Sequence, residues 1–251
     1  MVDDDETVQR LLQLGADVNA PAPGMKVRDH HHYDSRTALQ WSAENGNFEL
    51  CQVLMEAGAN INATPATEKG ITTLAAAVSS NNYRLAELLL KNGAEVNDQR
   101  GENTALETAA KLNDIRMTRL PPLTKADPRL ANSVIAAVQN RNYKLISTLL
   151  KAGADINKTP RAGTGALRVA TKMNDSGLVR FLLGAGANPN SDSPLTEAAR
   201  LGNLEMIEIL LRAGADCNHP ERGSGIGILF RQQRGKEIWT LCGIFSMQAL
   251  N

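Results

Sequence analysis

The nine residues LLKAGADIN, at positions 149–157, determine how this chain is interpreted, because five other segments nearly repeat them. The copies are LLQLGADVN at 11–19, LMEAGANIN at 54–62, LLKNGAEVN at 89–97, LLGAGANPN at 182–190 and LLRAGADCN at 210–218. Self-similarity at intervals of a few tens of residues is typical of repeat architectures, in which every unit is one small structural motif. The sequence therefore predicts an array of units.

Each copy closes a body of constant length. The glycines that mark the six copies are Gly15, Gly58, Gly93, Gly153, Gly186 and Gly214. Nineteen positions before five of them stands an aliphatic residue that begins a segment of small residues, at Leu39, Leu74, Val134, Leu167 and Leu195. Since that spacing is constant, the repeats differ in length only after the glycine. The pattern predicts rigid bodies of one size joined by loops of variable length.

A second marker divides each body into two helices. Seven positions after the aliphatic residue come Gly46, Asn81, Arg141, Asn174 and Gly202, and an additional copy that begins at Leu106 has Asn113. Five of these six residues are Gly or Asn, which tolerate the left-handed backbone conformation that ends a helix. We expect two short helices around a tight turn: an alanine-rich first helix, and a second helix with apolar residues at helical spacing, as in NLEMIEILLRAGA at 203–215.

Two segments resemble the ankyrin repeat, which has a period of about 33 residues and begins T-P-L-H-x-A. They are SPLTEAARLGNLEMIEILLRAGADCN at 193–218 and TALQWSAENGNFELCQVLMEAGANIN at 37–62. The resemblance covers roughly residues 1–218, and it implies an all-α solenoid of about six stacked helix-turn-helix pairs with hairpin loops. In such a solenoid each unit buries its apolar face only by stacking on its neighbours. The repeated GAD-x-N then ends the outer helix and starts the hairpin loop.

The array is expected to be irregular at both ends and in the middle. Residues 1–20 hold a partial repeat with only an outer helix, about Glu6 to Leu14, which is either a reduced cap or the edge of a longer array. Residues 21–218 form the array, with a degenerate repeat at about 98–125, and residues 219–251 form a divergent carboxy-terminal capping segment.

Two prolines define the degenerate repeat. Pro121 and Pro122 stand where the outer helix should continue, so that helix is predicted to stop near Leu120 and to be followed by a loop near 121–131. The break is either neutral decay that the neighbouring repeats tolerate or a hinge that shapes a binding face.

Composition argues against several classes of partner. Lys and Arg together number 27, as do Asp and Glu, so no global positive field favours nucleic acid. Without a run of about 18 or more apolar residues, no membrane span is expected.

The segment MVDDDETVQRLL lacks the basic start and apolar stretch of a signal peptide, and the three cysteines form no CxxC pair. We expect an intracellular monomer, in the cytoplasm, the nucleus or both.

No catalytic, metal or cofactor site is predicted. His30, His31 and His32 follow one another in a long loop, but a structural zinc site normally needs four ligands and no cysteine pair accompanies them, so we interpret them as an exposed finger. The sequence has no P-loop, HExxH or GxSxG motif. Cys51 and Cys217 occupy repeat positions where small apolar residues serve, with Val179 aligned to Cys51, and a packing role is expected for both.

The remaining candidate is a surface. In solenoids the stacked inner helices and loops line a concave face, which is the usual binding site. The residues just before each inter-helix turn should project toward it, and they are Glu44 and Asn45, Ser79 and Ser80, Lys111 and Leu112, Lys172 and Met173, and Arg200 and Leu201. Trp41 joins them, although its position could instead pack on the adjacent repeat. Each residue could also be a plain solvated helix end.

Two functions from different classes stay open at this point. The ankyrin resemblance implies a non-catalytic protein-binding module, acting as a regulatory adaptor such as a transcriptional co-regulator or inhibitor. The alternative is the targeting portion of a larger enzyme or receptor, which the half repeat at residues 6–20 suggests. The partner in either case is another protein.

Overall fold

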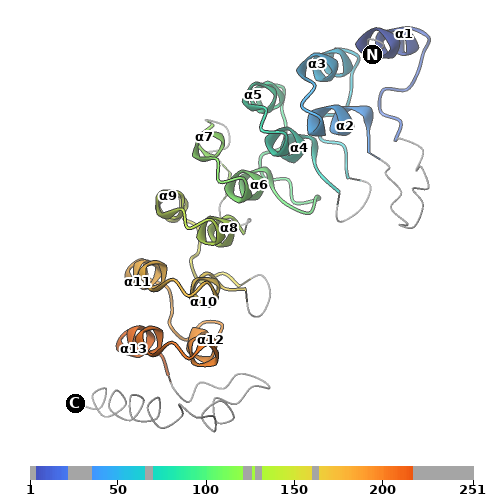
Figure 1. The fold of residues 1–251 in the computed structure, drawn as a ribbon. Coiled ribbons are helices and arrows are strands. Elements are labelled where there is room, and N and C mark those ends of the chain that lie inside the picture. The colour runs from blue at the N-terminus through green and yellow to red at the C-terminus, as the bar shows by residue number, and fades with distance from the viewer. Residues whose placement is uncertain are drawn as a thin grey trace, which may run out of the picture. The chain divides into compact units, whose positions relative to one another are not determined.

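The computed structural model describes residues 4–21, 36–65, 70–120, 126–127, 132–159 and 164–216. These residues form thirteen helices and no strand, apart from one isolated bridge between Pro21 and Thr37 (Figure 1). The chain divides into two compact units, Met1–Ser133 and Val134–Asn251, and each is described by itself.

The first unit contains one single helix and three helix pairs. Its helices are α1 (Asp4–Gln13), α2 (Ala38–Glu44), α3 (Phe48–Glu56), α4 (Thr73–Ser79), α5 (Tyr83–Lys91), α6 (Ala105–Lys111) and α7 (Ile115–Thr118). The first helix of each pair is called inner and the second outer. The inner helices α2, α4 and α6 pack on one another in order, and so do α1, α3 and α5. The single helix α1 has the place of an outer helix, as the sequence predicts (Figure 1).

The second unit contains three further pairs, and α8 begins one residue before it. Its helices are α8 (Ser133–Gln139), α9 (Tyr143–Lys151), α10 (Ala166–Lys172), α11 (Ser176–Gly184), α12 (Pro194–Leu201) and α13 (Leu204–Arg212). Inner helices α10 and α12 pack together, as do outer helices α11 and α13. The predicted all-α solenoid with six helix pairs is therefore confirmed.

The turn inside each pair has the predicted backbone conformation. All six marked residues have a positive φ: 67° at Gly46, 55° at Asn81, 59° at Asn113, 52° at Arg141, 56° at Asn174 and 67° at Gly202. The six glycines that end the outer helices have φ between 88° and 99°. Arg141 shows that repeat geometry imposes this conformation even on a residue that normally avoids it, at a cost of about 1–2 kcal/mol.

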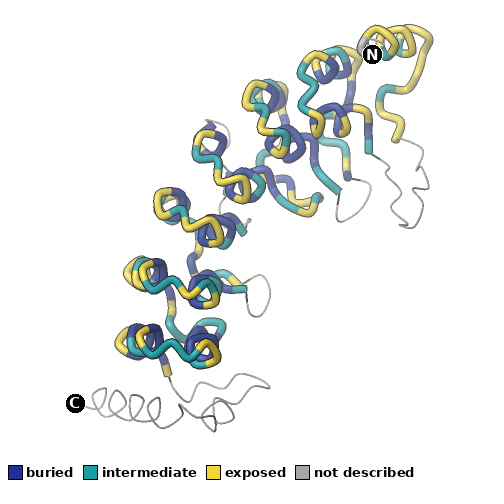
Figure 2. Tube along the Cα trace, viewed as in Figure 1, coloured by how far each residue is buried: buried dark blue, intermediate teal, exposed yellow. Residues whose placement is uncertain are grey.

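The core of each unit lies between its two layers of helices. Inner helices contribute small side chains, such as Ala43, Ala76 and Ala109, and outer helices contribute leucines, such as Leu54 and Leu89, all essentially inaccessible to solvent (Figure 2). Small inner residues let neighbouring helices approach closely, and the larger outer residues fill the space between layers.

Cys51 is part of this core and is fully buried. The Ser42 hydroxyl lies 3.1 Å from its sulfur, and burial raises the pKa of the thiol. Since the thiolate is the reactive form, this cysteine is chemically inert, and its predicted packing role is confirmed.

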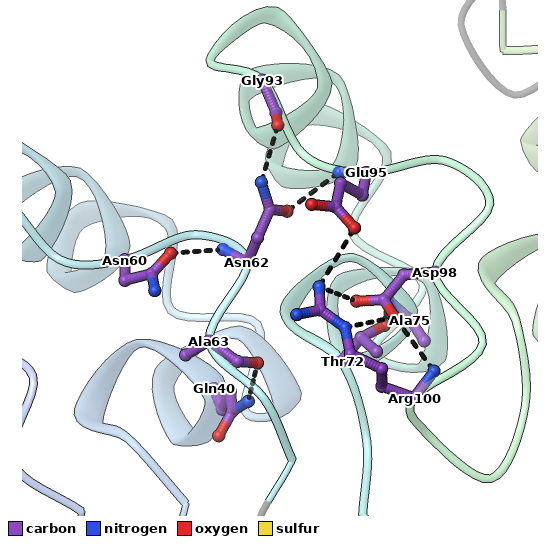
Figure 3. Close-up of polar contacts among 10 residues, drawn as sticks. All are labelled: Gln40, Asn60, Asn62, Ala63, Thr72, Ala75, Gly93, Glu95, Asp98 and Arg100. Atoms are coloured by element: carbon purple, nitrogen blue, oxygen red, sulfur yellow. Dashed lines mark hydrogen bonds and ion pairs between the residues drawn. The ribbon is translucent and has the colours of Figure 1, made fainter.

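The last asparagine of the repeated motif ties one hairpin loop to the next. Asn62 donates from Nδ2 to the Gly93 carbonyl at 3.0 Å and accepts at Oδ1 from the Glu95 amide at 2.9 Å (Figure 3). The same two bonds run from Asn19 to Gly58 and Asn60, from Asn157 to Gly186 and Asn188, and from Asn190 to Gly214 and Asp216. The motif recurs because each copy supplies two things: the asparagine that binds the next loop, and the backbone carbonyl and amide that the asparagine of the preceding copy binds.

The degenerate repeat retains part of this connection. Helix α7 ends at Thr118, which confirms the predicted stop near Leu120. Although no glycine motif follows, Asn97 Oδ1 accepts from the Asp127 amide at 2.8 Å, and Ala126 is buried like the alanine of the intact motifs. The pair Ala126 and Asp127 therefore holds the place of Ala-Asp in GAD-x-N, which sequence comparison missed because Lys125 stands where the others have glycine.

Other predicted segments lie outside the described residues. These are most of the loop at 121–131, the loop that carries His30, His31 and His32, Cys217, and the carboxy-terminal segment at 219–251.

Candidate binding surface

The free ends of the inner helices present one exposed position in every repeat. It lies two residues before the left-handed turn and is Glu44, Ser79, Lys111, Gln139, Lys172 and Arg200 in chain order. The left-handed residue turns the chain toward the outer helix, so no further helical turn covers these side chains. The residue that follows each of them is exposed or half-buried.

In the first unit this surface combines apolar and paired charged groups. Trp41 is 49% exposed and Leu112 is 45% exposed, so neither is buried by the adjacent repeat. Glu44 forms an ion pair with Arg36, and Lys111 Nζ lies 3.2 Å from Glu107 Oε1. Large side chains that keep half their area in solvent are available for contact with a partner.

Two predicted residues of the first unit are engaged with their own helix ends. Asn45 donates from Nδ2 to the Trp41 carbonyl at 2.8 Å, and the Ser80 hydroxyl donates to the Ala77 carbonyl at 3.0 Å. These bonds add a side-chain donor to carbonyl groups in the last helical turn, which also accept from the Asn45 and Asn82 amides. Ser79, in contrast, is exposed.

In the second unit the corresponding surface is basic. Arg200 binds the buried Glu197 through both Nε and a terminal nitrogen, at 3.1 and 2.5 Å, and Arg168 lies 3.5 Å from the other oxygen of that carboxylate. The hydrogen bond and the charge of Glu197 raise the pKa of the Arg200 guanidinium. Lys172 is exposed and Met173 is half-buried beside them. Two arginines thus contact one buried carboxylate, and the exposed Lys172 adds a third cation, so the charged residues named here carry a net positive charge.

The hairpin loop after α5 is held by a charged cluster. Asp98 Oδ1 accepts from the amide and the Nε of Arg100, both at 2.9 Å, and Arg100 also pairs with Glu95 at 3.0 Å (Figure 3). Burial alone would raise the pKa of the Asp98 carboxyl, but the hydrogen bonds from Arg100 lower it overall. Asp98 therefore stays ionised and fixes the loop between α5 and α6.

Within the described residues, no group of three or more His, Cys, Asp and Glu side chains could hold a metal ion. All four histidines of the chain lie outside those residues. Each helix in the same part of the chain is too short or too polar to cross a membrane.

Comparison with known proteins supports the architecture. The family described as ankyrin repeats (3 copies) matches residues 1–100 and 133–221, more than half of the chain. The chain belongs to the ankyrin repeat family. Ankyrin repeats are protein–protein interaction modules, and this is the general function of the chain.

Solved and curated proteins show the same relationship. The human ASB11 ankyrin repeat domain superposes with a TM-score of 0.61 at 25% identity, covering 82% of this chain and 98% of that domain. Dynein axonemal heavy chain 12 from Bos taurus is 30% identical over 221 residues, 84% of this chain and 51% of that protein. L-asparaginase from Dirofilaria immitis is 26% identical over 180 residues, 69% of this chain and 30% of that protein. The chain thus spans about half or less of the length of these curated relatives.

The ankyrin framework distributes the predicted residues over both units. Seven lie in the first unit and four in the second, and the set in each unit is described by itself. Sequence reasoning missed Gln139 and Asn140, which are exposed at the same positions of α8, and Arg168 and Glu197, which set the charge of the second surface. The constant spacing within the repeats would have identified Gln139 and Asn140. The Arg168–Glu197 contact joins two repeats and appears only in the folded chain.

Proposed function

We propose that this ankyrin chain is a non-catalytic regulatory adaptor that binds another protein through the exposed ends of its inner helices. One observation carries the proposal: a constant buried framework presents five different types of side chain at the same exposed position of six repeats. Carboxylate, hydroxyl, amide, ammonium and guanidinium groups all occur there. Variable chemistry on an invariant scaffold is what selective recognition requires.

The proposed surface has the composition of a protein interface. Exposed Trp41, Leu112 and Leu201 supply apolar contact area, and Lys172 and Arg200 supply charge. Aromatic and arginine side chains contribute a large share of binding energy at protein interfaces, and exposed charges govern mainly the encounter rate and specificity. The proposal includes an intracellular monomer, in the cytoplasm or the nucleus, that uses no cofactor or metal and does not bind nucleic acid directly.

The test compares two sets of substitutions in the same chain. A combined Glu44→Ala, Asn45→Ala, Lys111→Ala and Lys172→Ala variant removes exposed groups from the inner helix ends. The control, Glu49→Ala, Gln52→Ala, Lys91→Ala and Arg212→Ala, removes four exposed groups from outer helices. Both should fold normally, because exposed substitutions usually change stability by about 0.5 kcal/mol or less each.

Partners are captured from the native cell with the wild-type chain, identified, and then titrated against both variants. We expect the inner variant to lose affinity, with a difference from the wild type that is largest at low ionic strength because salt screens exposed charges, and the outer variant to keep its affinity. Loss only in the outer variant would assign binding to the opposite face. Equal affinity of all three chains would reject the inner helix ends as the site.

A second candidate is that this array targets a larger enzyme or receptor. The matches to only 51% of a dynein heavy chain and 30% of an L-asparaginase favour it, because both relatives carry a long additional sequence. Sequencing the full-length transcript separates the candidates. An in-frame enzymatic or receptor domain would support the second, and a transcript that encodes only the array would exclude it.

A further inference from the structure

An apolar groove lies on the outer side of the second unit, away from the inner helix ends. It has a volume of about 560 Å³ between helices α9 and α11. Its lining residues are Ser147, Leu150, Lys151, Phe181, Gly184 and Ala185. The two helices are held beside each other by an edge-to-face contact between Tyr143 and Phe181, with ring centroids 5.0 Å apart, and by the ion pair of Arg141 with Asp175 at 3.0 Å.

The groove exists because two positions carry small residues that are large in other repeats. The position of Gly184 is occupied in the other long outer helices by Glu56, Lys91, Lys151 and Arg212. The position of Ser147 is occupied by Gln52, Glu87, Arg180 and Glu208. Long side chains at these positions lie along the helix surface and cover apolar groups with their methylene stems. Their absence leaves Leu150 and Phe181 accessible.

The same two positions form a polar bridge on every other nine-residue outer helix. Gln52 donates to Glu56 at 3.1 Å on α3, Lys91 pairs with Glu87 at 3.0 Å on α5, and Arg212 pairs with Glu208 at 2.5 Å on α13. These are contacts between residues four apart on one helix face. On α9 the positions hold Ser147 and Lys151, and on α11 they hold Arg180 and Gly184, so neither bridge can form.

The charged residues within the two helices that line the groove are all basic. Helices α9 and α11 carry Lys144, Lys151 and Arg180 and no acidic residue, whereas α3, α5 and α13 each carry at least one glutamate. Arg180 pairs with the exposed Glu205 at 3.4 Å, a contact that solvent screens. Among the described residues no acidic side chain pairs with Lys151. The groove thus combines an apolar lining with the ammonium group of Lys151, and Lys144 and Arg180 lie on the same two helices.

We propose that this groove binds an amphipathic helix of a partner protein whose apolar face is flanked by carboxylates. Apolar side chains of such a helix would fill the space that Gly184 and Ser147 leave, against Leu150 and Phe181. Its carboxylates would face Lys144 and Lys151. This is helix-in-groove recognition, in which burial supplies affinity and charge supplies selectivity. The proposal concerns a second surface and does not depend on the inner helix ends.

The test titrates the full chain with two synthetic helical peptides by fluorescence anisotropy. Both peptides have leucines along one face, and the other face carries glutamates in the first peptide and lysines in the second. The variants Gly184→Gln and Ser147→Glu fill the groove, and Ser147→Glu also recreates on α9 the pair that Glu87 and Lys91 form on α5. No described atom lies within 4 Å of a Cβ added at Gly184, so that variant should fold. Glu56→Gln installs the same side chain at the same repeat position of α3 and is the matched control.

We expect the glutamate peptide to bind the wild-type chain and the control with equal affinity. Each groove variant should weaken it by about tenfold or more, the effect of blocking a binding hot spot. Circular dichroism and the thermal midpoint establish that the variants are folded. The proposal is overturned if the groove variants bind as the wild type does, if the lysine peptide binds as tightly, or if neither peptide binds.

Discussion

Outer helices α5 and α7 are neighbours in the first unit, and one is intact while the other is reduced. Helix α5 spans Tyr83–Lys91, buries Leu85 and Leu89, and is followed by the complete glycine motif. Helix α7 spans only Ile115–Thr118 and buries Met117 within its four residues. The loop after each helix nevertheless donates a backbone hydrogen bond to the asparagine of the preceding repeat. This asparagine is Asn62 for the loop after α5 and Asn97 for the loop after α7.

The difference shows which parts of a repeat the array requires. Inner helix α6 packs on α4 beside a reduced outer helix, and an asparagine still connects the loops. Because each repeat contacts only its neighbours, damage to one outer helix has local consequences. The inner stack and the asparagine connections are therefore the parts that persist.

The largest effect should come from the outer-helix core. Leu89→Ala leaves a cavity in α5 and should cost about 2–5 kcal/mol, whereas Met117→Ala in the four-residue α7 should cost near the lower end of that range, since a short segment can relax into the space. Urea unfolding of both variants measures this. Equal or reversed losses would show that α7 is held as rigidly as α5.

The second-largest loss of stability should come from a substitution at Gly93, the glycine that ends α5. Gly93 has φ of 92°, and no described atom lies within 4 Å of an added Cβ, so Gly93→Val should cost about 1–2 kcal/mol from backbone strain alone. The lower urea midpoint should appear without a change in the circular dichroism spectrum. An unchanged midpoint would contradict the requirement for glycine at this turn.

Loss of an asparagine connection should have a local effect. Asn62 binds Gly93 and Glu95 of the next loop, and Asn97 Oδ1 accepts from the Asp127 amide. Asn62→Ala and Asn97→Ala should each lose about 0.5–1.5 kcal/mol for every hydrogen bond removed, with faster exchange at the Glu95 amide in the first variant and at the Asp127 amide in the second. Hydrogen exchange at the Glu95 and Asp127 amides gives a local measurement. Faster exchange at both amides in either single variant would indicate that the connections are not independent.

The smallest effect concerns pH and the loop between the two pairs. The pKa of Asp98 is lower in the folded chain than in the unfolded chain, so its ionic contacts stabilise the fold above the unfolded value of about 4. That contribution disappears as pH falls through the folded value. Arg100→Ala should thus lower stability at neutral pH and have a smaller effect once Asp98 is protonated in the folded chain. A loss that is constant with pH would assign the role of Arg100 to packing.

Much of the fold could be predicted because the same pattern of residues occurs in six copies, and a pattern shared by six copies identifies helices and turns that a single copy would leave ambiguous. Six copies of one motif locate the helix pairs, and residues such as Asn81 and Gly202 identify the turns by their tolerance of left-handed geometry. A single proline pair places the end of α7 near Leu120, since proline cannot continue a helix. The candidate site was predicted only as a set of helix-end positions, because exposure follows from register and partner identity does not.

Local chemistry by itself determined the helices, their ends and the positions that reach solvent, since these depend on residues close in the chain. The tertiary structure alone decided what forms between repeats: the place of Ala126 and Asp127 in the degenerate repeat, the Glu197 carboxylate between Arg168 and Arg200, and the groove at Gly184. Each of these depends on the distance between two helices or loops of different repeats. That distance is set by side-chain packing across the whole stack, which no short segment of sequence specifies.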